Sequence, residues 1–278
     1  MTDKYCVAGC GRMGLPMALA MQRAGLDVMG FDVKPAHEFG SFSASMVTDP
    51  AAVSACTVLF SVVRDQKETE DLLFDRQALL LRAARPTLLV ICSTLSPRYV
   101  TALATRLPDM THLVDAPMSG APVAAEERRL SFMLGGDPGD IDRIRPALDA
   151  MGTAFHHMGG HGTGMTAKVL NNYLAALSTI GVRQALDWAD QLDVDEEALL
   201  AVMNDSSGQT WFGSNFDRIE FARHGYASDN TIAILEKDLR ALLDALAPAV
   251  HGALPEAAIN ALRRLSPRPA QNRHETDS

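Results

Sequence analysis

A glycine-rich loop near the start of the chain constrains the fold more than any other feature. Gly9, Gly11 and Gly14 form the pattern G-x-G-x-x-G, directly after the β-prone run Tyr5–Ala8 and before the helix-forming residues 15–24. In such a context the first glycine allows a tight turn, the second lets the backbone approach a pyrophosphate, and the third permits close helix–strand packing. The pattern therefore predicts a dinucleotide-binding βαβ unit, and not merely a glycine-rich turn without a ligand.

The rest of this loop and the strand after it indicate which dinucleotide is bound. Cys10, Arg12 and Met13 complete the expected cofactor-binding loop, and Asp32 ends the next expected strand, about 20 residues further on. A carboxylate at that point bonds the ribose hydroxyls of NAD and repels the 2′-phosphate of NADP. We therefore expect NAD to be preferred. NADP is the alternative because Lys34 lies close by, and FAD uses the same fingerprint.

Strand-like and helical runs alternate as far as residue 161. Continuous apolar runs of this kind are typical of parallel strands that are buried on both faces. The expected strands cover residues 57–63, 87–91, 113–114 and 131–134, and the expected helices begin near residues 50, 66, 97 and 140. We therefore predict an α/β fold, with a Rossmann-type dinucleotide-binding domain over residues 1–161.

From residue 163 onward the periodicity is helical only. One helix of roughly 28 residues is expected over 163–192, because the run has helical spacing and no proline. Further helices are expected over residues 195–204, 215–224, 231–247 and 255–265. The long interdomain helix thus opens an all-α domain over residues 162–265. Residues 266–278 are polar and contain proline, so we expect a disordered tail.

Composition excludes several classes of partner. The chain has 278 residues, a net charge of −9 and a pI near 5.3. It lacks the clustered Lys and Arg that nucleic acid and anionic membranes require. No apolar run approaches the ~18 residues of a membrane span, and the early strand leaves no room for a signal peptide. The four cysteines form no CxxC pair, which suits a reducing compartment. A cytoplasmic protein is expected.

Two polar residues on the long helix point to chemistry. Lys168 and Asn172 are one helical turn apart, so both side chains project from the same face. A lysine among apolar neighbours is costly unless a partner or a task offsets that cost. Together with the glycine loop, this pair predicts a nicotinamide enzyme that uses a lysine as acid and base.

Four motifs resemble the β-hydroxyacid dehydrogenases, a family that includes 3-hydroxyisobutyrate dehydrogenase and tartronate semialdehyde reductase. In chain order they are residues 9–18 (G-x-G-x-M-G-x-x-M-A), 115–121 (D-x-P-x-S-G-G), 162–172 (G-x-G-x-x-x-K-x-x-N-N) and 237–239 (K-D-L). Ala121 replaces the second glycine of the substrate motif, and this substitution puts one backbone approach in doubt.

The resemblance implies hydride exchange between NAD(P) and a small 3-hydroxy acid or its semialdehyde. Lys168 would be the general acid and base, for which burial must lower its pKa toward neutrality. Asn172 would hold the substrate oxygen or the lysine ammonium. Ser119 and the backbone at Gly120 and Ala121 would bind the substrate carboxylate.

The resemblance also implies further contacts. Thr94 would lie near the nicotinamide ribose and the substrate, Val63 and Arg64 near the adenosine side, and Lys237 near the nicotinamide end. In isolation Lys237 could be a solvated helix residue and Thr94 a helix cap. A homodimer or homotetramer is expected, because an unpartnered long apolar helix would expose a sizeable patch.

Several alternatives remain open. A glyoxylate or succinic semialdehyde reductase would run the same chemistry toward the alcohol. An imine reductase-like enzyme is disfavoured because its relatives lack the lysine, and a non-catalytic cofactor-binding protein would need no general acid. The cluster His156, His157 and His161 raises the question of a metal, but no Asp, Glu or Cys lies beside it at ligand spacing. No metal is therefore expected.

Overall fold

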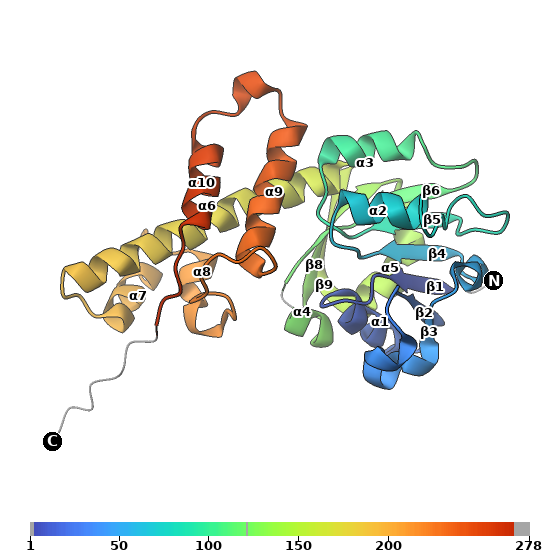
Figure 1. Ribbon diagram of the computed structural model, residues 1–278, viewed down its shortest axis with the longest axis horizontal. Helices are drawn as coiled ribbons and strands as arrows, with labels where there is room; N and C mark the ends of the chain where they lie inside the picture. Colours follow the sequence, from blue (N-terminus) through green and yellow to red (C-terminus); the bar gives the residue numbers. More distant parts are fainter. Residues whose placement is uncertain (1–2, 121, 270–278) are drawn as a thin grey trace. The chain divides into compact units, whose positions relative to one another are not determined.

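The computed structural model describes residues 3–120 and 122–269, and Figure 1 shows the elements along the chain. The chain divides into two compact units, Met1–Lys168 and Val169–Ser278. The long helix α6 (Thr163–Gln191) begins in the first unit and continues through the second. The predicted domain boundary, between residues 161 and 162, falls just before this helix.

A nine-stranded sheet forms the centre of the first unit. Its strand order is β3-β2-β1-β4-β5-β6-β8-β7, with β9 paired to β8. Pairing is parallel from β3 to β6, whereas β8 runs antiparallel to β6 and β7 and parallel to β9. The strands are β1 (Tyr5–Ala8), β2 (Val28–Phe31), β3 (Met46–Val47), β4 (Val58–Ser61), β5 (Leu88–Ile91), β6 (His112–Asp115), β7 (Met118–Ser119), β8 (Leu130–Gly136) and β9 (Gly152–Gly159).

Helices cover both faces of this sheet, because alternate residues of each strand point to opposite sides. In β1, Tyr5 and Val7 pack in one core cluster with α1 and α5, while Cys6 and Ala8 pack in a second cluster with α2 and α3. This arrangement confirms the Rossmann-type fold. The helical elements are α1 (Gly14–Arg23), η1 (Ala36–Ser45), η2 (Pro50–Ala55), α2 (Gln66–Leu73), α3 (Pro97–Ala104), α4 (Pro122–Glu126) and α5 (Pro138–Met151).

The carboxyl ends of the parallel strands bring four loops together along one edge of the sheet. Hydrogen bonding between neighbouring strands continues one residue past the end of each strand. Gly9 N–H donates to Phe31 O at 2.9 Å, and Val62 N–H donates to Ala8 O at 2.8 Å. Likewise, Cys92 N–H donates to Ser61 O at 2.9 Å and Ala116 N–H donates to Ile91 O at 2.8 Å. The loops that follow β1, β4, β5 and β6 therefore leave the sheet side by side, as ligand-binding loops of open α/β sheets do.

Strand β9 was not predicted from the sequence, where the histidine cluster only raised the question of a metal. It lies beside β8, and most of its residues are half-buried or exposed. Such a strand lacks the apolar pattern by which the other strands were identified. His157 lies in it and its Nε2 contacts two backbone carbonyls, Gly136 O at 3.1 Å and Gly159 O at 3.0 Å.

The second unit is entirely helical in its described residues. Two core clusters form along α6: one joins it to α9 and α10, and the other to α7 and α8. Within the described part of the chain, no helix has the length and hydropathy that a bilayer crossing needs. After α6 come α7 (Glu196–Asn204), α8 (Trp211–Ser214), η3 (Phe216–Arg218), α9 (Thr231–Ala245), η4 (Pro248–Val250) and α10 (Leu254–Arg263).

The helix predicted over residues 215–224 is wrong. Only the short η3 forms there, and turns follow it, whose last carbonyl groups accept hydrogen bonds from distant arginines. The Arg183 guanidinium is 2.8 Å from both Ala222 O and His224 O, and Arg223 O accepts the Arg268 N–H at 2.8 Å.

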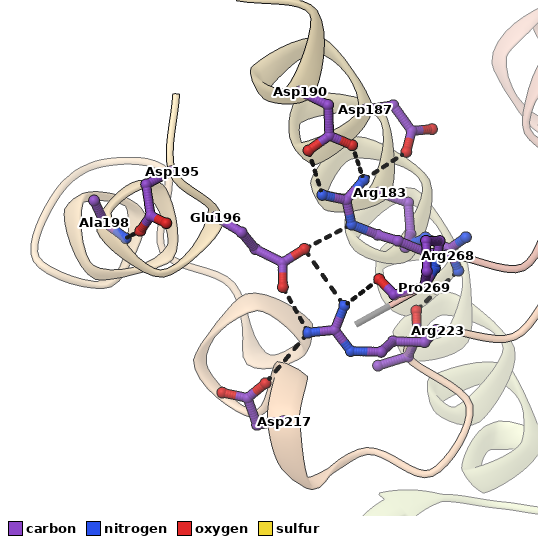
Figure 2. Close-up of polar contacts among 11 residues, drawn as sticks. Arg183, Asp187, Asp190, Asp195, Glu196, Ala198, Asp217, Arg223, Arg268 and Pro269 are labelled. Atoms are coloured by element: carbon purple, nitrogen blue, oxygen red, sulfur yellow. Dashed lines mark hydrogen bonds and ion pairs between the residues drawn. The ribbon is translucent and has the colours of Figure 1, made fainter. Parts of the chain in front are cut away.

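The tail predicted from residue 266 is also wrong for its first four residues. Arg268 inserts its guanidinium beside α6 and α7, where its side chain is 4% exposed (Figure 2). Its Nη1 lies 2.7 Å from Asp190 and 3.0 Å from Asp187, and its Nε lies 2.7 Å from Glu196. A cation at this end of α6 also complements the helix dipole. Residues 270–278 lie outside the described residues.

Candidate active site

Packing requires two of the three glycines in the loop after β1. Gly9 has φ +90°, and a Cβ there would lie 2.8 Å from Val62 O. A Cβ on Gly14 would collide with Gly9 O, because α1 begins directly against the loop. Both glycines therefore let the loop turn tightly between β1, β4 and α1.

Gly11 has no such internal reason for lacking a side chain. No described atom lies within 4 Å of the position that its Cβ would take. Within the described residues, no side chain caps α1 at its N-cap, Met13. An open surface beside Gly11, next to an uncapped helix N-terminus, fits the close approach of a pyrophosphate. The loop is thus built as a dinucleotide cradle.

Asp32 is joined directly to this loop. Its Oδ2 accepts the backbone N–H of Cys10 at 2.8 Å, and its Oδ1 accepts that of Lys34 at 3.1 Å. The Cys10 side chain points into the core, where its Sγ lies 3.4 Å from Val7 O. Burial, and secondarily the Asp32 charge, raises the pKa of the Cys10 thiol to about 12. Cys10 can therefore serve a cofactor only through its backbone, while Arg12 is exposed.

The loops after β4 and β5 are tied to each other. Ser93 Oγ donates to Val63 O at 2.5 Å, which places Thr94 one residue beyond the tie. Arg64 is exposed, and both its backbone N–H and its Nη2 bond Glu68, at 2.9 and 2.7 Å. These loops lie along the sheet edge that also carries the glycine loop. The structure therefore gathers the predicted cofactor residues of the first unit.

The residues predicted to bind a carboxylate lie on and after β7. Ser119 is half-buried and pairs with Ser131 of β8. Gly120 has φ +135°, and a Cβ there would lie 2.8 Å from the Ala124 Cβ. Only glycine fits this turn without strain. Ala121, the third residue of the predicted carboxylate site, lies outside the described residues.

Helix α6 carries the predicted acid/base pair. Lys168 is 8% exposed and Asn172 is 9% exposed, so both side chains are buried on one face of the helix. In the second unit, Asn172 Nδ2 donates to Asp238 Oδ2 at 2.5 Å. The other oxygen of Asp238 is 3.2 Å from Lys237 Nζ. The buried amide of Asn172 therefore has the hydrogen-bond partner that a polar group inside a protein needs, namely the carboxylate of Asp238.

Two buried aspartates, one in each unit, were not predicted as functional residues, although both lie inside the motifs of the resemblance. Asp238 is the middle residue of the K-D-L motif, and Asp115 is the first residue of the substrate motif. Their side chains are buried and accept hydrogen bonds from residues of α6 or of the turn before it. Among the described residues, no group of three or more His, Cys, Asp or Glu side chains could hold a metal ion.

Two family models match the chain, and they meet near the start of α6. The first, described as the NAD binding domain of 6-phosphogluconate dehydrogenase, matches residues 4–160. The second, described as NAD-binding of NADP-dependent 3-hydroxyisobutyrate dehydrogenase, matches residues 162–269. Together they cover nearly all the described residues.

Individual relatives agree with these models. A 3-hydroxyisobutyrate dehydrogenase of Pseudomonas aeruginosa is 33% identical over 93% of this chain and 90% of its own length. An NAD-dependent L-serine dehydrogenase of the same organism is 33% identical over 73% of this chain and 70% of its own. The solved Mycobacterium tuberculosis 3-hydroxyisobutyrate dehydrogenase with L-serine has a TM-score of 0.77 and 28% identity, and the match covers 94% of this chain and 92% of that one.

Proposed function

Because the chain belongs to the 3-hydroxyisobutyrate dehydrogenase family of NAD(P)-dependent hydroxyacid dehydrogenases, we propose that it oxidises a small 3-hydroxy acid with Lys168 as general base. The observation that carries this proposal is the burial of Lys168, which is 8% exposed on the same face of α6 as Asn172. Burial of a lysine is costly, and a role as proton acceptor is a reason to retain it there. In the reverse direction Lys168 is the general acid.

The proton follows a short path in this proposal. When the hydroxyl carbon gives up its hydride, the hydroxyl proton passes to Lys168 Nζ, and the carbon becomes a carbonyl. The nicotinamide, when bound, supplies the hydride acceptor or donor. Asn172 orients the substrate oxygen or the lysine ammonium, and its own amide is held in turn by Asp238. Groups held in this way lower the barrier mainly by positioning.

The cofactor is assigned to the loops at the carboxyl ends of β1, β2, β4 and β5. Gly9, Gly11 and Gly14 would receive the pyrophosphate, and Asp32 the adenine ribose, so NAD is the preferred form and NADP the alternative. Val63, Arg64 and Thr94 would line the same cofactor, and Lys237 would reach its nicotinamide end. The glycine at position 11, which has no internal packing reason, is the strongest support for this assignment.

The substrate class is a small carboxylate with a hydroxyl on the β-carbon. Ser119 and the backbone at Gly120 would bind the carboxylate with neutral donors. Glyoxylate or succinic semialdehyde reduction is the same chemistry in reverse, whereas imine reduction would not need the retained lysine. A panel of 3-hydroxyisobutyrate, L-serine, glyoxylate and succinic semialdehyde, followed by nicotinamide absorbance, distinguishes these substrates. No turnover with any hydroxy acid or aldehyde acid would refute the proposed activity.

Lys168→Ala tests the assigned role directly. Turnover should fall at least about a hundredfold, the usual scale for a lost general acid, while NADH affinity stays nearly unchanged. Lys67→Ala is the matched control, because Lys67 is an exposed lysine of the same unit that pairs with Asp71 on α2. Turnover of Lys168→Ala equal to that of the control would exclude the proposed mechanism.

Assembly and location complete the proposal. We infer a homodimer or homotetramer, because Leu174, Trp188 and Trp211 of the helical unit are each more than half exposed, at 65%, 57% and 65%. Light scattering after gel filtration measures the mass, and a monomer would contradict this inference. A cytoplasmic location is part of the proposal, supported by four cysteines that are all buried and unbridged.

A further inference from the structure

The start of α6 is attached to the sheet through a buried carboxylate. Asp115 ends β6 and is 0% exposed. Its Oδ1 accepts the N–H of Gly162 at 2.8 Å, and its Oδ2 accepts the N–H of Met165 at 2.7 Å. These donors belong to the first turn of α6 and the residue before it, where backbone N–H groups have no partner inside the helix. Asp115 thus caps the start of a helix that is distant in sequence, since Gly162 is 47 residues away from it.

Two glycines make room for this attachment. A Cβ on Gly135 of β8 would lie 2.5 Å from Asp115 Oδ1, so any side chain there would displace the carboxylate. A Cβ on Gly164 would lie 2.5 Å from Met133 O, so α6 begins in direct contact with the backbone of β8. The same turn contacts the loop after β5, since the Leu95 N–H points to Met165 Sδ at 3.3 Å. The first turn of α6 is therefore constrained from three sides.

Holding a carboxylate at this depth is costly. Burial raises the pKa of Asp115, and the N–H groups of Gly162 and Met165 oppose that rise. A negative charge at a helix N-terminus does, however, stabilise the helix start and fix the direction of its first N–H groups.

Lys168 lies three residues beyond Met165 on the same helix, a rise of about 4.5 Å. We propose that Asp115 is the positioning residue of Lys168: its two hydrogen bonds set where the first turn of α6 lies and so where the lysine is presented. This inference rests on the proposed function of Lys168. Displacements of about 1 Å at a reacting group can cost about a hundredfold in rate, so loss of the anchor has a measurable effect.

The test compares Asp115→Asn with wild type, followed by kinetics and by hydrogen exchange of peptides covering residues 162–168. The NH₂ group of asparagine would lie against a backbone N–H, and both groups are hydrogen-bond donors. The backbone amides of the first turn of α6 should therefore exchange faster with solvent. We expect kcat to fall at least about tenfold while the NADH dissociation constant changes less than about twofold. Gly135→Ala, which pushes the carboxylate without removing it, should shift both measurements in the same direction and serves if Asp115→Asn folds poorly.

Asp137→Ala is the matched control, because Asp137 caps α5 of the same unit by accepting the Gly139 N–H at 2.8 Å. It should lower stability without changing kcat or the exchange of residues 162–168. Unchanged exchange in both test variants, or faster exchange with wild-type kcat, would overturn the proposal. Lys168→Ala is measured in parallel. If that variant keeps wild-type turnover, the proposed function fails and the positioning role fails with it, whereas an inactive Lys168→Ala beside a fully active Asp115→Asn rejects the positioning role alone.

Discussion

Asn172 on α6 and Asp238 on α9 are joined by a hydrogen bond of 2.5 Å between Nδ2 and Oδ2. An ionised carboxylate only accepts, so this contact fixes which way the asparagine amide points. The Asp238 side chain is 1% exposed, and its Oδ1 lies 3.2 Å from Lys237 Nζ. One buried aspartate of the K-D-L motif therefore orients the asparagine of the K-x-x-N-N motif, and it lies within ion-pair distance of Lys237.

Replacing Asp238 by alanine should release the Asn172 amide and lower kcat/KM by about ten- to a hundredfold. The unfolding free energy should also fall by about 1–3 kcal/mol, because a buried donor loses its acceptor. Asp238→Asn keeps an acceptor oxygen for Asn172 but loses the charge beside Lys237, so it should be affected less. Steady-state kinetics and urea unfolding measure both effects. Wild-type kcat/KM in Asp238→Ala would show that the amide orientation does not matter.

The Asp32 carboxylate should set the preference between NAD and NADP. Asp32→Asn removes the charge that repels a 2′-phosphate, so the ratio of kcat/KM for NAD over NADP should drop at least about tenfold, which corresponds to about 1.4 kcal/mol. Asp27→Asn is the control. Asp27 is exposed and comes just before β2, whereas Asp32 comes just after this strand. A wild-type enzyme that already prefers NADP would contradict the assignment of NAD.

Stability of the helical unit should depend on pH through Glu236. Its carboxylate bonds Arg263 at 2.7 and 2.9 Å, Arg240 at 2.9 Å and Tyr226 at 2.9 Å. The Arg263 hydrogen bonds, followed in effect by those of Arg240 and Tyr226, lower the pKa of Glu236 from 4.5 to about 2 against the opposing effect of burial. A lowered pKa stabilises the folded state at every pH above the pKa of the unfolded chain, about 4.5. This stabilisation is lost as the pH falls from about 4.5 to about 2.

Glu236→Gln removes the charge at every pH and so separates this contribution. The variant should cost on the order of 2 kcal/mol of unfolding free energy at pH 7 and progressively less as the pH falls below about 4. Denaturant unfolding at pH 7 and pH 3.5 gives the two differences. An equal cost at both pH values would mean that the ion pairs with Arg263 and Arg240 do not carry the effect.

The guanidinium of Arg268 should be a large single contribution to the stability of the second unit. Arg268→Ala leaves Asp187, Asp190 and Glu196 without this partner, although Arg223 still reaches Glu196 (Figure 2). We expect a loss of about 1–3 kcal/mol in urea unfolding, because the variant loses the charge-assisted hydrogen bonds of a buried guanidinium. Asp187 and Asp190 are about half exposed and the buried Glu196 keeps Arg223, so solvent and that arginine limit the cost. Arg268→Lys should recover little, since an ammonium cannot bond both Glu196 and Asp190 along one planar group.

Arg264→Ala is the control for this experiment, since Arg264 is an exposed arginine just after α10. Its stability should stay within about 0.5 kcal/mol of wild type. Equal losses in Arg264→Ala and Arg268→Ala would indicate a general effect of positive charge and not the buried ion pairs of residue 268.

Local patterns in the sequence predicted most elements of the first unit and the helical character of the second. Strands such as Leu88–Ile91 are buried on both faces, so they appear in the sequence as continuous apolar runs that are easily identified. Strand β9 was missed because it is largely exposed, and in place of the helix over 215–224 the chain forms turns whose Ala222 and His224 carbonyls bond Arg183. In both regions the deciding partner is distant in sequence.

Spacing in the sequence was enough to predict the α/β fold and the family, and it led to the glycine loop, Lys168 and Asn172 as the proposed functional residues. Spacing carries this information, since strand and helix periods and turn glycines act over a few residues. The three-dimensional structure was needed to show which side chains bond groups that are distant in sequence. Asp115 and Asp238 are 47 and 66 residues from the groups that they bond, and Arg268 reaches across 78 residues to Asp190. Such contacts depend on how the chain closes on itself, which no local pattern encodes.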